Sequence, residues 1–158
     1  MKKETEPMKT DAEMTAVIAR AIANEESSAA FYRQAAVRVS DPVTRDALEG
    51  LMRDELDHKR ILEEFLSGTR PLPAGATAGG SLVESLGAPD FTADLSPADA
   101  FLLAARKEKL AVEFYENWAR LYSGGPERDL LLKLAEVERR HKAKVEDLFT
   151  NAAYPEAW

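Results

Sequence analysis

Apolar and small residues recur at helical spacing along four stretches of the chain. Examples are Val17, Ala21 and Ala29 in the first stretch and Leu48 and Leu62 in the second. The predicted helices span about residues 11–39, 42–66, 97–122 and 126–150. Each stretch is long enough for several helical turns and has one apolar face, so it must pack against its neighbours. The sequence therefore predicts an all-α fold, a four-helix bundle.

A segment from about residue 67 to residue 96 interrupts the helical pattern. It contains Pro71, Pro73, Gly79 and Pro89, which disfavour a long helix. A connection of this length is expected where the second and third helices run parallel, because the chain must then return along the bundle. We therefore predict that residues 1–158 form a single domain of two helical hairpins joined by a crossover loop.

The two predicted hairpins repeat one sequence pattern at a separation of 83 positions. The corresponding pairs include Glu25 and Glu108, Tyr32 and Tyr115, Leu48 and Leu131, Glu55 and Glu138, and His58 and His141. The repeat includes charged positions as well as apolar ones, so the regular spacing of apolar residues along a helix does not explain it. Each half of the chain is therefore expected to be a hairpin built to the same plan.

The chain contains two histidines, and both lie in a Glu-x-x-His pattern. These are Glu55 with His58 and Glu138 with His141. Residues three positions apart share a helix face, so each pair can be directed at one centre. A single buried histidine is usually an ordinary core residue, but a repeated pair with glutamate favours a metal site.

Each half also has a glutamate 30 positions before its Glu-x-x-His pattern, Glu25 in the first and Glu108 in the second. About 14 residues separate Glu25 from the end of its helix, roughly 21 Å at the helical rise. The antiparallel partner returns about 12 residues to Glu55, roughly 18 Å. An antiparallel hairpin therefore brings Glu25 level with Glu55 and His58, and Glu108 level with its counterparts.

Glu25 and Glu108 lie among apolar and small residues, which predicts that their side chains are buried. Four ionised carboxylates buried together would cost several kcal/mol each without compensation. Two divalent cations would neutralise them, and carboxylate with imidazole suits iron, or manganese or a mixture of the two metals. The alternative for both glutamates is a solvated helix face. Tyr32 and Tyr115 are expected either in the core or beside the metals.

The amino-acid composition excludes several kinds of site and disfavours several kinds of partner. The chain has no cysteine, which excludes disulfides, thiolate metal sites and iron–sulfur clusters within this sequence. The formal net charge is −7, which disfavours nucleic acid and anionic membranes as partners. We see neither an apolar signal segment nor a membrane span, so we expect a cytoplasmic protein. Surface acids such as Asp54 are expected to be solvated.

These motifs resemble the rubrerythrin-type branch of the ferritin-like superfamily. The residues that carry the resemblance are Glu25, Phe31-Tyr32, Glu55-x-x-His58, Glu108, Phe114-Tyr115 and Glu138-x-x-His141. The resemblance implies a ferritin-like bundle with a non-haem di-iron centre that reacts with peroxide or dioxygen. It also implies that Glu55 and Glu138 bridge the metals, that Glu25 and Glu108 are terminal ligands, and that each histidine binds one metal.

The sequence departs from the rubrerythrin pattern in two ways. It lacks the cysteines of the rubredoxin domain that usually delivers electrons, so an external electron donor is expected. Rubrerythrins also carry an extra glutamate three residues after the third-helix ligand, and that position is Ala111 here. We expect a redox enzyme that reduces a small oxidant, and a homo-oligomer, with a dimer as the simplest form. The alternatives are a ferroxidase or iron-handling protein, and a metal-stabilised structural or sensory bundle.

Overall fold

The computed structural model describes residues 11–69 and 94–155, and within them the fold is entirely helical. The helices are α1 (Asp11–Arg38), α2 (Pro42–Thr69), α3 (Pro97–Ala119) and α4 (Pro126–Ala153). The predicted all-α four-helix bundle is confirmed. None of these described helices has a stretch long and apolar enough to cross a membrane.

Helix starts follow local side-chain chemistry. The carboxylate of Asp41 accepts hydrogen bonds from the Thr44 backbone N–H at 2.8 Å and from its hydroxyl group at 2.5 Å, and Pro42 opens α2. The Ser96 hydroxyl group accepts from the Asp99 backbone N–H at 3.1 Å at the start of α3. These caps satisfy amide groups that have no partner inside the helix, so they fix where α2 and α3 begin.

The observed helix ends differ from the predicted ones. Helix α2 continues to Thr69, because Gly68 does not adopt the left-handed conformation that ends many helices; among the described residues only Gly125 has a positive φ, of 98°. Helix α3 ends at Ala119 instead of Tyr122, since Leu121 and Tyr122 make tighter bonds to carbonyls three residues back. Helix α1 ends at Arg38, one residue early, and α4 runs on to Ala153.

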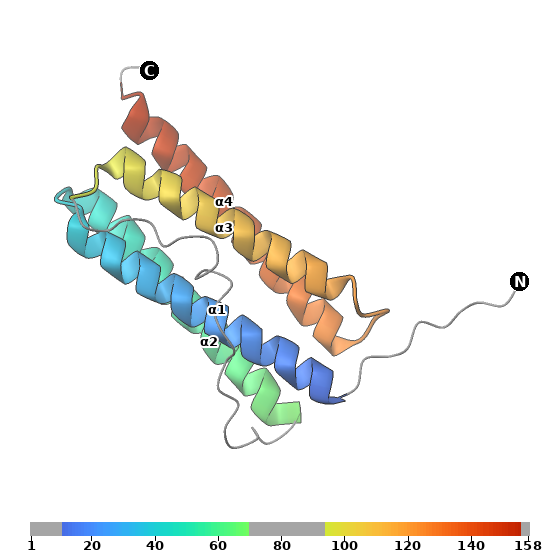
Figure 1. Cartoon of the computed structure of the whole chain (residues 1–158). Helices are drawn as coiled ribbons and strands as arrows, with labels where there is room; N and C mark the ends of the chain where they lie inside the picture. The colour runs from blue at the N-terminus through green and yellow to red at the C-terminus, as the bar shows by residue number, and fades with distance from the viewer. Residues whose placement is uncertain (1–10, 70–93, 156–158) are drawn as a thin grey trace, which may run out of the picture.

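The helices form two antiparallel hairpins, α1 with α2 and α3 with α4 (Figure 1). The start of α3 lies beside the end of α1, where the Leu95 backbone N–H donates to the Arg38 carbonyl at 3.0 Å. Figure 1 shows that α2 and α3 consequently run in the same direction. The predicted crossover loop, about 67–96, falls mostly on residues 70–93, which lie outside the described residues.

The described helices form two separate apolar clusters, and each cluster contains residues from all four helices. The first includes Tyr32, Leu48, Phe101 and Val145, and the second includes Ile18, Leu62, Tyr115 and Leu131. On every helix the predicted ligand positions fall between the residues of one cluster and those of the other. The bundle therefore has a polar layer at mid-height, enclosed above and below by apolar side chains.

Candidate metal centre

Six acidic and histidine side chains fill this polar layer, and all are buried. We call them the six-residue cluster: Glu25, Glu55, His58, Glu108, Glu138 and His141. Each is 8% exposed or less. The expectation that Glu25 and Glu108 point into the bundle is confirmed, and the solvated alternative is wrong. Burying four carboxylates at one level is unfavourable unless positive charge compensates them.

The six side chains converge as two overlapping groups. One contains Glu25, Glu55, His58 and Glu138, and the other contains Glu55, Glu108, Glu138 and His141. Within each group the candidate ligand atoms all lie within 4.8 Å of one another. Glu55 and Glu138 belong to both groups, so their carboxylates stand between two adjacent positions for a cation.

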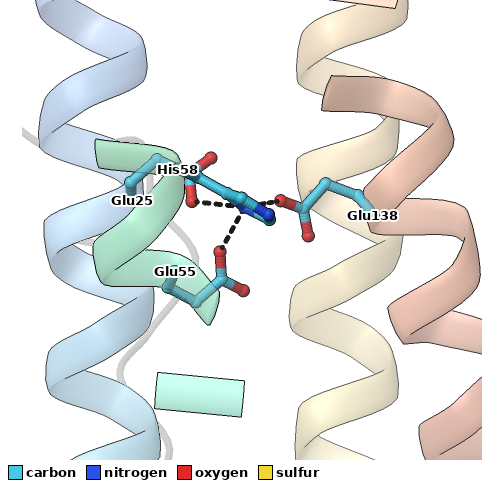
Figure 2. Close-up of side chains that lie close together, drawn as sticks. All are labelled: Glu25, Glu55, His58 and Glu138. Atoms are coloured by element: carbon cyan, nitrogen blue, oxygen red, sulfur yellow. Dashed lines mark ion pairs between the residues drawn. The ribbon is translucent and has the colours of Figure 1, made fainter. Parts of the chain in front are cut away.

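His58 lies at the centre of the first group (Figure 2). Its Nδ1 atom is 3.0 Å from Glu138 Oε1, 3.2 Å from Glu55 Oε2 and 3.4 Å from Glu25 Oε2. Figure 2 shows that Glu25 and Glu55 reach this atom from one hairpin while Glu138 reaches it from the other. The contact between His58 and Glu138 therefore joins the two hairpins at the site.

His141 has the corresponding place in the second group. Its Nδ1 atom is 3.4 Å from Glu138 Oε2 and 3.8 Å from both Glu55 Oε1 and Glu108 Oε2. The rings of His58 and His141 are nearly parallel, with an interplanar angle of 16° and centroids 5.4 Å apart. Both imidazoles thus present Nδ1 to the shared carboxylates, and each Glu-x-x-His pair is directed at one centre.

Asp54 is a contact that the sequence did not reveal. Its Oδ2 atom lies 3.2 Å from Nε2 of His141, on the side of the ring that faces away from the cluster. The Asp54 side chain is half exposed, which agrees with a surface acid, but it also contacts a buried residue. The available signal was its position directly before Glu55, and that signal is weak because surface acids are common beside helical ligands.

Tyr32 and Tyr115 both contact the six-residue cluster. The Tyr32 hydroxyl group donates a hydrogen bond to Glu108 Oε1, and the Tyr115 hydroxyl group donates to Glu25 Oε1. Each bond crosses from one hairpin to the other. Burial raises the pKa of both tyrosines well above the usual value, and nearby glutamates add to the effect, so both hydroxyls keep their protons.

The second oxygen of each of these glutamates has no hydrogen bond, and the same holds for most of the cluster. Seven buried atoms of the cluster form no hydrogen bond, although they lie at ion-pair distances from one another: Glu25 Oε2, Glu55 Oε2, His58 Nδ1, Glu108 Oε2, both carboxylate oxygens of Glu138, and His141 Nδ1. Buried polar atoms in folded proteins almost always have partners. These seven are oxygen and imidazole nitrogen donors directed at one region, which fits a pair of metal ions.

The pKa values show how strongly the cluster needs positive charge. Burial, together with neighbouring carboxylates, raises the pKa of Glu55 well above its usual value and that of Glu108 to about 10. Burial alone would lower the pKa of His58, but its contacts with Glu138, Glu25 and Glu55 outweigh burial and raise it to about 12. Burial opposes the ionisation of Glu138, yet both histidines lower its pKa overall. Protons held by these side chains thus compensate the negative charge of the buried carboxylates, and metal cations can replace those protons.

A four-helix bundle with paired Glu-x-x-His motifs and two further glutamates has the architecture of di-metal carboxylate proteins. The sequence model of the ferritin-like domain matches residues 13–151, and the chain belongs to this family. A comparison with curated proteins gives no match. The fold is similar to that of a hypothetical protein from Pyrococcus furiosus, with a TM-score of 0.66 and 18% identity over 96% of this chain and 99% of the other.

Proposed function

We propose that the six-residue cluster holds two iron ions and that the protein is a di-iron redox enzyme. The observation that carries this proposal is the set of seven buried oxygen and nitrogen atoms that form no hydrogen bond and converge between the hairpins. Membership of the ferritin-like family supports it. In this proposal Glu55 and Glu138 would be shared by both ions, Glu25 and Glu108 would each be a ligand of one ion, and His58 and His141 would each bind one ion.

The donor set supports iron over other metals, with manganese or a mixed pair as the alternative. It contains carboxylate oxygen and imidazole nitrogen but no sulfur, which disfavours structural zinc and soft metals. Four carboxylates balance the charge of two divalent ions, so loading removes the need for the protons that Glu55, Glu108 and His58 otherwise retain.

The proposed reaction is the reduction of hydrogen peroxide or dioxygen by an external electron donor. Reduction of peroxide breaks the O–O bond, consumes two protons and two electrons, and yields two water molecules. When bound, two iron ions suit this chemistry because each can provide one electron. The chain contributes the ligands, and the apolar clusters on both sides of the polar layer limit access of water.

The resemblance to rubrerythrins favours peroxide as the oxidant. We therefore expect the reduced protein to react faster with hydrogen peroxide than with dioxygen. The sequence has no cysteine for a second redox centre, so steady turnover is expected to depend on an added electron donor.

Two variants are compared with the wild type in the test of this proposal. Glu138→Gln changes a carboxylate common to both groups, and Glu136→Gln is a matched control because Glu136 is 53% exposed on the same helix.

The test is anaerobic loading with ferrous iron, followed by stopped-flow oxidation with each oxidant and measurement of protein-bound iron afterwards. The proposal predicts faster oxidation by peroxide, retention of both ions, and turnover only with a donor, in wild type and in Glu136→Gln but not in Glu138→Gln. Faster oxidation by dioxygen with release of ferric iron would favour an iron-handling protein. Tight binding without oxidation by either reagent would favour a structural or sensory bundle.

A further inference from the structure

The two halves of the candidate site repeat closely, but they differ beside the histidines. All six members of the cluster correspond in pairs across the 83-position repeat, and so do Tyr32 and Tyr115. The position that corresponds to Asp54 is Val137. Asp54 contacts His141 through Oδ2 and Nε2 at 3.2 Å, whereas a valine offers no hydrogen-bond acceptor. The repeat is therefore broken at a residue that touches a candidate ligand.

The two imidazoles are in different environments as a result. Both direct Nδ1 at the shared carboxylates. On the opposite edge of its ring His141 faces Asp54, while no carboxylate of the described residues pairs with Nε2 of His58. An imidazole that binds a metal through Nδ1 carries its proton on Nε2. Within residues 11–69 and 94–155, only the His141 ring has a carboxylate in position to accept that proton.

A carboxylate that accepts the outer N–H of a metal-binding histidine has two effects. It fixes the tautomer and the orientation of the ring, and it makes the ligating nitrogen more basic. Loss of such a partner typically weakens metal binding by about 10–100-fold. The Asp54 side chain is 50% exposed, so water competes for the bond, and we expect an effect near the lower end of that range.

We propose that Asp54 is a positioning residue that makes the two metal positions inequivalent, so that the position beside His141 binds its ion more tightly than the position beside His58. This inference rests on the proposed metal centre. It implies that the first ion enters beside His141 and that a different metal is more easily accommodated beside His58. The two halves of the chain then have the same arrangement of ligands but bind their ions with different affinities.

Four variants separate this role from a general effect of surface charge. Asp54→Ala removes the acceptor, and Asp54→Asn keeps the shape of the side chain without its charge. Asp57→Ala removes a carboxylate that is 68% exposed, three residues further along α2, where it pairs with Arg60 and not with a histidine. Val137→Asp is the reciprocal change, since Val137 is also partly buried and holds the place of Asp54 in the second half.

The probe is Co²⁺, a divalent ion whose binding is followed by visible absorption in competition with a chelator. Asp54→Ala and Asp54→Asn should each weaken the overall affinity for two ions by roughly tenfold. Val137→Asp should strengthen the weaker step, and Asp57→Ala should leave both steps unchanged. A crystal loaded with one equivalent of Co²⁺ should show anomalous scattering beside His141.

A merely structural contact would change the thermal stability of the metal-free protein in the Asp54 variants without changing Co²⁺ affinity. That result, or anomalous scattering beside His58 at one equivalent, would overturn the inference and leave the metal centre intact. Failure of the wild type to bind any Co²⁺ would contradict both the proposed metal centre and this inference.

Discussion

The hydroxyl group of Tyr32 in the first hairpin donates a hydrogen bond to Glu108 in the second. The hydroxyl group of Tyr115 in the second hairpin likewise donates to Glu25 in the first, so the repeat produces two hydrogen bonds between the hairpins at the centre of the bundle. Each tyrosine donates to one carboxylate oxygen and leaves the other oxygen without a hydrogen bond. The pair therefore holds the proposed terminal ligands in place while leaving one oxygen of each available to a metal.

Replacing Tyr32 with phenylalanine should destabilise the protein. The change leaves one more oxygen of Glu108 buried without a partner, and the expected loss in free energy of unfolding is about 1–3 kcal/mol. Tyr115→Phe should behave alike because its contact with Glu25 is equivalent. Urea unfolding of the metal-free protein measures both effects. Tyr154→Phe is the control, since Tyr154 is 61% exposed, and equal stability of all three variants would contradict the structural role.

The stability of the metal-free protein should fall as the pH rises. The pKa of Glu108 is about 10 in the folded protein and 4.5 in an unfolded chain, so between these values the folded state holds a proton that the unfolded state has lost. Stability from this group is complete below pH 4.5 and is lost as the pH approaches 10. The raised pKa values of Glu55 and His58 act in the same direction.

Urea unfolding of the metal-free protein at pH 6 and pH 9 measures this slope. Glu108→Gln should make the slope shallower because an amide does not titrate, and Glu113→Gln should not, since Glu113 is 52% exposed on the same helix. Metal-loaded protein should be more stable than metal-free protein, and most clearly at pH 9. Stability of the metal-free protein that rises between pH 6 and pH 9 would show that the cluster is not buried as described.

Much of the candidate site follows from the sequence because its geometry is local to each hairpin. The distance of Glu25 and of Glu55 from their shared turn, measured in helical rise, already places them at one level. Their apolar neighbours indicate which face they occupy, and the structure confirms that both are buried. That the cluster binds metal stays a prediction.

The contacts between the hairpins do not follow from spacing within either one. Tyr32 could be assigned to the core or to the site, but its partner Glu108 is 76 positions away, and the pairing depends on how the hairpins dock. Asp54 reaches His141 for the same reason. The end of α2 also lies beyond the predicted one, because glycine at position 68 permits a left-handed cap without requiring one.

Changing Ala111 to glutamate tests how far the resemblance to rubrerythrins extends. Ala111 lies three residues after Glu108 on α3, so a carboxylate there would share its helix face. If the proposed chemistry is of the rubrerythrin type, Ala111→Glu should alter the ligation of oxidised iron, seen by Mössbauer spectroscopy, and change the rate with peroxide. Identical spectra and rates in the variant and the wild type would contradict that mechanism.

The most direct test of the metal centre is a crystal structure of protein loaded with ferrous iron, with anomalous scattering recorded at the iron edge. We predict two ions about 3.5–4 Å apart, as in other two-metal sites, with Glu55 and Glu138 between them. We also predict that Glu25 and His58 bind one ion while Glu108 and His141 bind the other. A single ion, or Glu25 and Glu108 turned away from the metals, would contradict the account.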